Sequence, residues 1–283
     1  MIISNSEVEA YQKCERLHWF AYGLNLTPTE HSMPIKCGIM GHAVLEAYYR
    51  SRMNLQSHDE CIQAGLAVIA DYMVRHGEYY SARIIPIVTN RFLQYAKLYE
   101  HEPWEILDVE GVYIIPLANG IEYALTLDLL IKWTSGEYKG LQSVVDHKWV
   151  YNFWTADEVH MMAQIPKYLW GLQRLGSQAS FGIVNQIRYR DMKGEPDDLF
   201  KRSRIEPTQK RLENIANIQR RAAQRIVEAK GSTWESEAIP SISKQNCRNC
   251  FFRLPCSIEI DGRDPTLTLA VNYIRNTYGY SGS

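Results

Sequence analysis

The sequence Val144-Val145-Asp146-His147-Lys148-Trp149 places a carboxylate and an ammonium two residues apart in an apolar run, the pattern of a buried strand with one charged pair. Side chains at positions i and i+2 of a strand lie on one face of its sheet. A second apolar run, Ala124-Leu125-Thr126-Leu127-Asp128-Leu129-Leu130, carries a single acid. A carboxylate inside such a strand loses its water, which is costly unless a cation or hydrogen-bond donors compensate.

Asp128 and Asp146 converge on one hard cation if these two strands are neighbours. Mg²⁺ suits such a site, since it takes oxygen ligands and is usually held by one or two carboxylates plus water. A divalent ion makes a water nucleophilic and stabilises the charge that develops in phosphodiester hydrolysis, while Lys148 can orient that water. The alternative is a structural ion pair, because Asp-x-Lys alone is common by chance.

The residues on either side of these runs predict an antiparallel meander of three strands in the middle of the chain, with helices flanking it. Asn119-Gly120 is a strong hairpin signal, because a type I′ turn needs positive φ at both central positions. The elements predicted in this region are strand 105–116, strand 121–133, strand 142–151, helix 155–175 and strand 181–190.

Residues 1–104 form a helical region in this interpretation. Ser4 and Glu7 have the spacing of a capping box, which marks the start of the first helix. The predicted helices are 4–24, 39–53 and 59–100, the last with breaks near Gly77 and Pro86. With the sheet core at 105–190, they make up most of a single domain spanning residues 1–283.

A basic segment follows over residues 191–239. It begins with a polar, Pro-interrupted loop over 191–207 and continues as a helix over 208–230. Between residues 201 and 230 nine basic residues stand against three acidic ones, a local charge of 9 − 3 = +6. This stretch is either a solvated helix face or a track for phosphates.

Cysteines cluster in residues 240–264, with the spacing Cys247-x₂-Cys250-x₅-Cys256, ahead of a tail over 265–283. Thiolates at this spacing suit zinc or an iron–sulfur cluster. Three ligands leave one position open, and the remaining cysteines, Cys14, Cys37 and Cys61, all lie in the N-terminal part. One distant fourth ligand fits a [4Fe–4S] cluster better than a zinc ribbon, which normally shows a second Cys-x₂-Cys. Zinc stays the alternative.

Composition bounds the class of protein. A length of 283 residues with 46% apolar residues indicates one or two globular domains, and 31 basic against 32 acidic residues exclude a histone-like coat. No apolar run approaches the roughly 20 residues of a membrane helix, and the start of the chain lacks a secretory signal pattern. We therefore expect a cytoplasmic protein with reduced thiols and no membrane partner.

Taken together, these motifs resemble the PD-(D/E)XK nuclease superfamily, in its RecB-like branch with a [4Fe–4S] cluster. That branch includes CRISPR-adaptation exonucleases and the nuclease domains of AddB-type helicase–nucleases. The matching residues are Cys14 as the lone N-terminal cluster ligand, Gly38-x₃-His42, Asp128, Asp146-x-Lys148, Gln164-x₃-Tyr168 and the C-terminal Cys spacing. The chain departs from the family pattern at Glu15, where Pro is usual, and at Leu125, where Gly is usual.

The resemblance implies a restriction-endonuclease-like fold, in which a central mixed sheet is flanked by helices, with a helical N-terminal region and a C-terminal iron–sulfur lobe. It implies that Asp128 and Asp146 bind Mg²⁺ or Mn²⁺, with His42 and the backbone carbonyl of His147 as further ligands. Lys148 then positions the attacking water. Gln164 and Tyr168 contact DNA or support the site, and the cluster is held by Cys14, Cys247, Cys250 and Cys256.

The function that we expect is metal-dependent hydrolysis of DNA, by an exonuclease acting on single-stranded or frayed ends. The chain has no G-x₄-G-K-[ST] motif, so it is a stand-alone nuclease or a subunit beside a helicase, recombinase or CRISPR-adaptation partner. Repair and recombination are settings that suit it. Two alternatives remain open: a non-catalytic DNA-binding subunit, and a zinc-stapled enzyme of another class.

Two further groups of residues have less definite roles. Glu110, in the first strand, reads as a residue behind the site or as a solvated strand residue. Some of the aromatic residues that follow the lysine belong to the core, and one or two can stack on unpaired bases: Trp149, Tyr151, Phe153 and Trp154.

Overall fold

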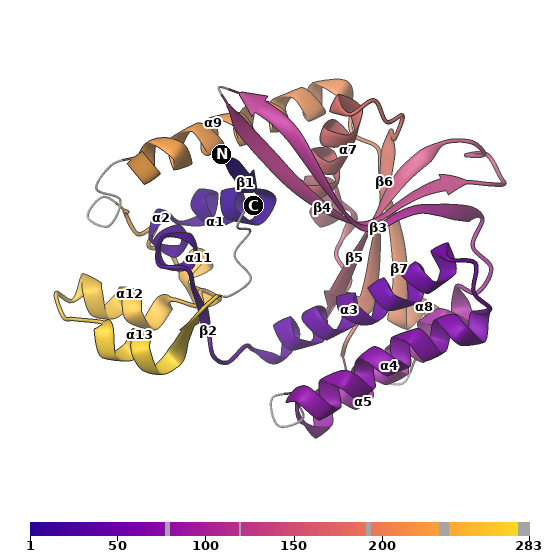
Figure 1. The fold of residues 1–283 in the computed structure, drawn as a ribbon, viewed down its shortest axis with the longest axis horizontal. Helices are drawn as coiled ribbons and strands as arrows, with labels where there is room; N and C mark the ends of the chain where they lie inside the picture. The colour runs from indigo at the N-terminus through magenta and orange to yellow at the C-terminus, as the bar shows by residue number, and fades with distance from the viewer. Residues whose placement is uncertain (77–79, 119, 191–193, 232–237, 277–283) are drawn as a thin grey trace. The chain divides into compact units, whose positions relative to one another are not determined.

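The computed structural model describes residues 1–283 apart from 77–79, 119, 191–193, 232–237 and 277–283. It is a mixed α/β protein with a central mixed sheet and flanking helices (Figure 1). The chain divides into two compact units. The first contains residues 1–31, 114–124 and 216–283, and the second contains residues 32–113 and 125–215.

Strand pairing gives a six-stranded mixed sheet among the described residues, in the order β1-β4-β5-β6-β7, with β3 (Trp104–Ala118) also paired to β4. β4 (Ile121–Trp133) and β5 (Gln142–Val150) are antiparallel, with Leu129 opposite Val145. β5 runs parallel to β6 (Phe181–Arg188), and β6 antiparallel to β7 (Phe200–Ile205). The strands predicted at 105–116, 121–133, 142–151 and 181–190 are therefore confirmed.

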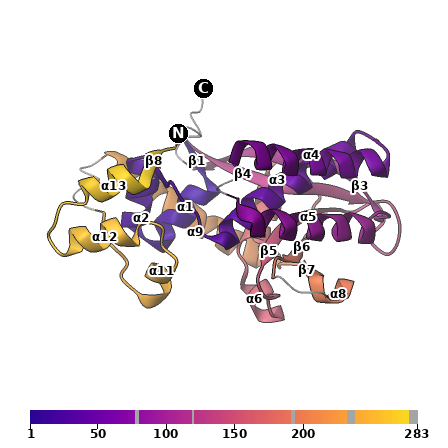
Figure 2. The same cartoon turned by 90° about the horizontal axis from the view of Figure 1, so that it is seen from below.

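Helices cover the sheet of the second unit. β5 and β6 are buried at consecutive positions, a pattern that arises when both faces of a sheet are covered. α3 (Met33–Met53) and α7 (Gln164–Arg174) both pack against β5. α4 (His58–His76) and α5 (Ser81–Leu98) lie side by side next to α3 (Figures 1 and 2). α6 (Ala156–Met161) and α8 (Pro196–Leu199) are short.

The first unit gathers both ends of the described chain. β1 (Ile2–Ser4) pairs in parallel with the start of β4, and Ser4 caps α1 (Asn5–Lys13) by accepting from the Glu7 N–H at 3.1 Å. β2 (Leu26–Pro28) pairs with β8 (Tyr273–Arg275) over a core of stacked Phe20, Phe252 and Tyr273. The remaining elements are α2 (Glu15–His18), η1 (Trp19–Gly23), α9 (Gln209–Gly231), α11 (Lys244–Arg248), α12 (Arg253–Ile260) and α13 (Thr266–Asn272), the last two side by side in Figure 2.

Several predicted boundaries are wrong, each for a physical reason. The helix predicted over 4–24 is interrupted by the extended backbone of Cys14. α5 continues through Pro86, because burial of Ile84, Ile87 and Val88 outweighs one missing hydrogen bond. The predicted loop 191–207 contains β7, which is a strand because it pairs with β6, and the predicted tail contains α13 and β8.

Two other sequence predictions can be compared with the structure only over the described residues. Gly120 has φ +76, as the predicted hairpin turn requires, while Asn119 lies outside the described residues. None of the helices in the described ranges combines the length and the apolar character needed to cross a bilayer.

Gly41 on α3 has no room for a side chain. An added Cβ would lie 2.0 Å from the Trp149 ring, whereas at Gly38, one turn earlier, it would meet nothing within 4 Å. We expect Gly41→Ala to lower the free energy of unfolding by about 1–3 kcal/mol through overpacking. Gly38→Ala serves as the matched control and should raise it by about 0.5–1 kcal/mol. Urea denaturation measures both, and equal effects would contradict the packing.

Candidate metal centre and active site

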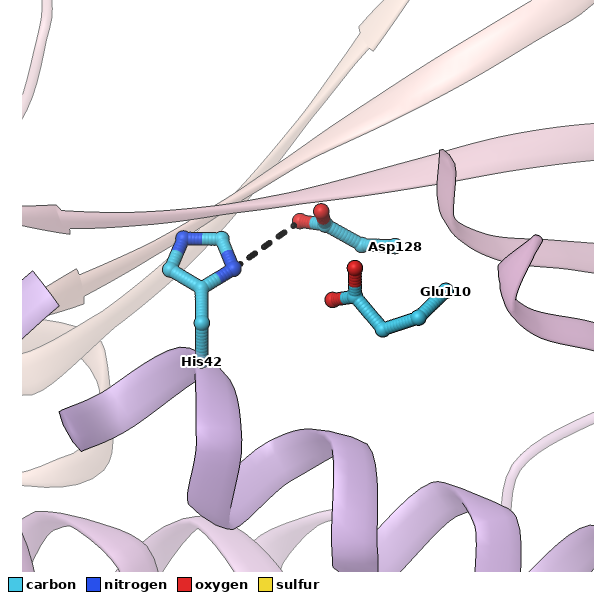
Figure 3. Close-up of side chains that lie close together, drawn as sticks. All are labelled: His42, Glu110 and Asp128. Carbon is cyan, nitrogen blue, oxygen red and sulfur yellow. Dashed lines mark ion pairs between the residues drawn. The ribbon is translucent and has the colours of Figure 1, made fainter. Parts of the chain in front are cut away.

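Three side chains from separate elements of the second unit meet at one point: His42 from α3, Glu110 from β3 and Asp128 from β4. One ligand atom from each lies within 4.8 Å of the others, and His42 Nδ1 is 3.5 Å from Asp128 Oδ2. Figure 3 shows the imidazole and both carboxylates pointing toward one another. Carboxylate oxygens with one imidazole are a donor set suited to a divalent cation.

Asp146 and Lys148 extend this group along β5. Lys148 Nζ lies 2.9 Å from Asp146 Oδ1 and 2.8 Å from Oδ2, and Asp146 is fully buried. The His147 backbone N–H donates to Asp128 Oδ2 at 2.6 Å, so β4 and β5 are neighbours here, as the two apolar runs required. Continued by one residue, the β4–β5 register sets Asp128 opposite Asp146.

Burial disfavours the ionised form of each carboxyl group at this site. Burial raises the pKa of Asp128 and of Asp146 to about 6, although Lys148 offsets part of this effect. Burial and the neighbouring Asp128 and Glu46 raise the pKa of Glu110 to about 8. Burial and Lys148 lower the pKa of His42 to about 4, so its imidazole is neutral and able to act as a ligand. A cation among these groups would relieve the crowding of negative charge.

Glu110 is the member of the site that sequence reasoning undervalued. Its φ of +50 is in the left-handed region, which non-glycine residues rarely adopt. Asp108 shapes the strand here by accepting from the Val109 N–H at 2.9 Å and the Tyr113 hydroxyl at 2.7 Å. A Cβ on Gly111 would lie 2.0 Å from the Asp108 carboxylate. A glycine directly after an acid inside a predicted strand was the available signal, since it often marks a bulge.

A buried polar network holds His147 behind the site. Its ring stacks on Tyr49 with centroids 5.5 Å apart, and Nδ1 lies 2.7 Å from Asn185 Nδ2. Asn185 also donates to the Tyr95 hydroxyl at 2.9 Å. Arg202 reaches Tyr95 at 3.0 Å and Glu102 at 2.5 Å. This network fixes the β5 backbone from which the Asp128 hydrogen bond comes.

Three other predicted site positions are the His147 backbone, Gln164 and Tyr168. The rings of His42 and His147 lie edge to face with their centroids 6.4 Å apart, which brings the His147 segment close to the proposed ligand His42. Gln164 donates to the Tyr168 hydroxyl on the first turn of α7, which packs against β5 and β6. Tyr168 is buried and Gln164 is half-buried. Their roles stay predictions.

Four cysteines line one cavity of about 280 Å³ in the first unit: Cys14, Cys247, Cys250 and Cys256. The Ser241 backbone N–H lies 3.3 Å from Cys14 Sγ, and burial with the neighbouring Cys14 and Cys250 raises the pKa of Cys256 to about 11. Over the described ranges, no three of the sulfurs lie within 4.8 Å of one another. Cys37 and Cys61 are fully buried in the second unit and do not line this cavity.

Comparison with known proteins gives one family match. A family model described as the PD-(D/E)XK nuclease superfamily matches residues 2–257. A putative exonuclease from Eubacterium rectale is similar in structure at 12% identity, with 88% of each chain covered and a TM-score of 0.51. No curated protein matches the sequence.

Two weaker structural likenesses were also found. An alkaline exonuclease from Laribacter hongkongensis has 14% identity, 62% of this chain and 85% of that one covered, and a TM-score of 0.34. A protein titled SSO0001 has 16% identity, 66% and 78% covered, and a TM-score of 0.36.

The raised pKa of Glu110 makes the stability of the metal-free protein depend on pH. The folded chain keeps this proton up to about pH 8, whereas the unfolded chain releases it near about pH 4.3, so stability falls as pH rises between these values. We expect Glu110→Gln to reduce the loss of unfolding free energy between about pH 5 and about pH 9. Urea denaturation in chelator measures it.

Glu122→Gln is the matched control, because Glu122 is exposed on β4. It should keep the wild-type pH dependence. A Glu110→Gln protein whose stability falls with pH as steeply as that of the wild type would contradict the site's electrostatics.

Proposed function

The chain belongs to the PD-(D/E)XK nuclease superfamily, and from this membership we propose that it is a metal-dependent DNA nuclease. We propose further that it is an exonuclease acting on single-stranded or frayed ends. The observation that carries the proposal is the meeting of His42, Glu110 and Asp128 beside the Asp146–Lys148 pair. It supplies oxygen and nitrogen ligands next to one ammonium, which is the set of groups that phosphodiester hydrolysis needs.

Asp128, Asp146, His42 and the His147 backbone carbonyl would hold Mg²⁺ or Mn²⁺, with Glu110 as an additional carboxylate. When bound, the ion supplies charge stabilisation and a water of lowered pKa. Lys148 Nζ lies 2.9 Å and 2.8 Å from the two oxygens of Asp146, so the ammonium is held beside the carboxylates. There it can hold the attacking water in line and stabilise negative charge on the phosphate.

The basic segment supports DNA binding through fewer residues than its sequence suggested. Six of its nine basic residues have structural partners: Lys201, Arg202, Arg204, Arg211, Arg220 and Lys230. Lys210, Arg221 and Arg225 are the better candidates for phosphate contacts, and the last two line a hollow with Tyr11 and Glu15. Gln164 and Tyr168 are proposed to contact the DNA strand or to support the site.

We propose a structural [4Fe–4S] cluster in the cavity of the first unit, held by Cys14, Cys247, Cys250 and Cys256. Zinc–sulfur bonds of about 2.3 Å require sulfurs about 3.8 Å apart. Among the described residues, no three of the thiol sulfurs all lie within 4.8 Å of one another, so no such zinc site is assembled there. The cluster would tie Cys14, at the break between α1 and α2, to α11 and α12.

Lys148→Ala should lower the rate of DNA hydrolysis by about 10²–10³-fold, because it removes the fixed charge that stabilises the transition state. The measurement uses end-labelled linear and closed circular single-stranded DNA with Mn²⁺ or Mg²⁺, after anaerobic purification. Lys132→Ala is the matched control, since Lys132 pairs with Glu105 at the surface, and it should keep wild-type activity. Degradation of linear DNA alone indicates an exonuclease.

A wild-type protein that binds DNA but cuts neither substrate would overturn the enzymatic proposal. It would favour a non-catalytic DNA-binding subunit of a helicase, recombinase or CRISPR-adaptation complex.

Cys14→Ala should lose iron and acid-labile sulfide, while the wild type carries about four irons per chain. Cys37→Ala is the matched control, because Cys37 is buried in the core of the second unit, and it should keep the wild-type iron content. Metal analysis of anaerobically purified protein measures both. Zinc without iron in the wild type would replace the cluster by a zinc site.

A further inference from the structure

Two aromatic–arginine pairs lie directly beyond the ends of β5 and β6. Tyr151 and Phe153 follow β5, and Arg188 and Arg190 stand at the end of β6. The guanidinium of Arg188 is 4.1 Å from the Phe153 ring centroid, and that of Arg190 is 5.4 Å from the Tyr151 ring centroid. Each pair combines an aromatic face with a fixed positive charge.

A buried side chain holds the backbone that carries both arginines of these pairs. Arg91 of α5 is 5% exposed, and its guanidinium donates to the backbone carbonyls of Arg188 at 2.8 Å and Arg190 at 2.9 Å. Tyr189, between them, is buried and packs against Tyr151 with ring centroids 5.8 Å apart. A buried arginine thus fixes the backbone that presents both guanidinium groups.

The aromatic side is anchored as well. The Trp154 backbone N–H donates to the side-chain carbonyl of Gln186 at 2.7 Å, and Gln186 is fully buried on β6. The segment carrying Tyr151 and Phe153 is therefore held at both ends, by β5 and by this bond. Groups positioned before the ligand arrives lose little further entropy on binding.

Tyr151 differs in exposure from the nearby aromatic ring of Trp149, which belongs to the core. Trp149 packs over Gly41 as part of the core, whereas Tyr151 is 52% exposed. About half of the surface of Tyr151 is therefore accessible to a ligand. Tyr151 is three residues beyond Lys148, about 10 Å along an extended chain.

We infer that Tyr151–Arg190 and Phe153–Arg188 form a stacking platform for unpaired nucleotides next to the cleaved phosphate. This inference rests on the proposed function, since Lys148 marks the position of that phosphate. Every base has a π-face, so such a platform binds single strands without reading sequence, and the guanidinium groups contact the phosphates between the bases. Paired bases in a duplex keep their faces stacked on each other and cannot use it.

The test measures binding of fluorescently labelled single-stranded and blunt duplex DNA by full-length protein in Ca²⁺, by anisotropy. Tyr151→Ala should weaken single-strand binding about tenfold, and Tyr151→Phe, which keeps the ring, should restore it. Duplex affinity should change less than twofold in both variants. 2-Aminopurine in the single strand should lose its stacking quench in Tyr151→Ala.

Tyr138→Ala is the matched control, because Tyr138 also pairs with an arginine, Arg204 at 4.5 Å, but precedes β5 rather than following it. It should keep wild-type single-strand affinity. A Tyr151→Ala protein that cleaves DNA and binds single strands like the wild type would overturn the platform and leave the proposed function intact. A wild type that neither binds nor cleaves DNA would overturn both.

Discussion

Acidic side chains are buried at the end of the β4–β5 ladder, and the surrounding elements are arranged to accommodate their charge. Asp128 and Asp146 are buried, and Glu110 approaches them from β3. The protein compensates with one ammonium, Lys148, and one backbone N–H, from His147. Because these donors do not balance the negative charge, the arrangement is costly by itself and would be stabilised by a cation.

The neighbouring elements position the side chains around these buried acids. α3 approaches β5 closely because Gly41 leaves space for Trp149, and this approach brings His42 to Asp128. Behind the site, the polar network from Glu102 and Arg202 to Asn185 holds His147. The side chains that we propose as ligands are therefore positioned by packing and hydrogen bonds that need no metal, which would keep the cost of ordering the site low on binding of an ion.

The sequence predicted the parts of this account that depend on local pattern. The two apolar runs predicted strands that bring Asp128 and Asp146 together if they are neighbours, and the strand boundaries were correct within a few residues. Glu110 could not be predicted, because its left-handed backbone depends on contacts among Asp108, Tyr113 and Gly111. β7 was missed because its pairing with β6, and not its own composition, makes it a strand.

The choice of the fourth cysteine of the predicted cluster shows a second limit of prediction from sequence. Spacing alone grouped Cys247, Cys250 and Cys256, but it did not decide between Cys14 and Cys37 as the fourth ligand. Resemblance to a family favoured Cys14, and the structure lines one cavity with Cys14 and those three cysteines while burying Cys37 in the core of the other unit. Long-range convergence of this kind requires the folded chain, since more than two hundred residues separate the members.

Anomalous diffraction from crystals soaked in Mn²⁺ tests the central claim most directly. We expect one strong manganese peak bonded to Asp128 and within reach of His42, Asp146 and Glu110. Manganese bound elsewhere, or a site that stays empty in protein that is active with Mn²⁺, would contradict the claim that these buried carboxylates bind a cation.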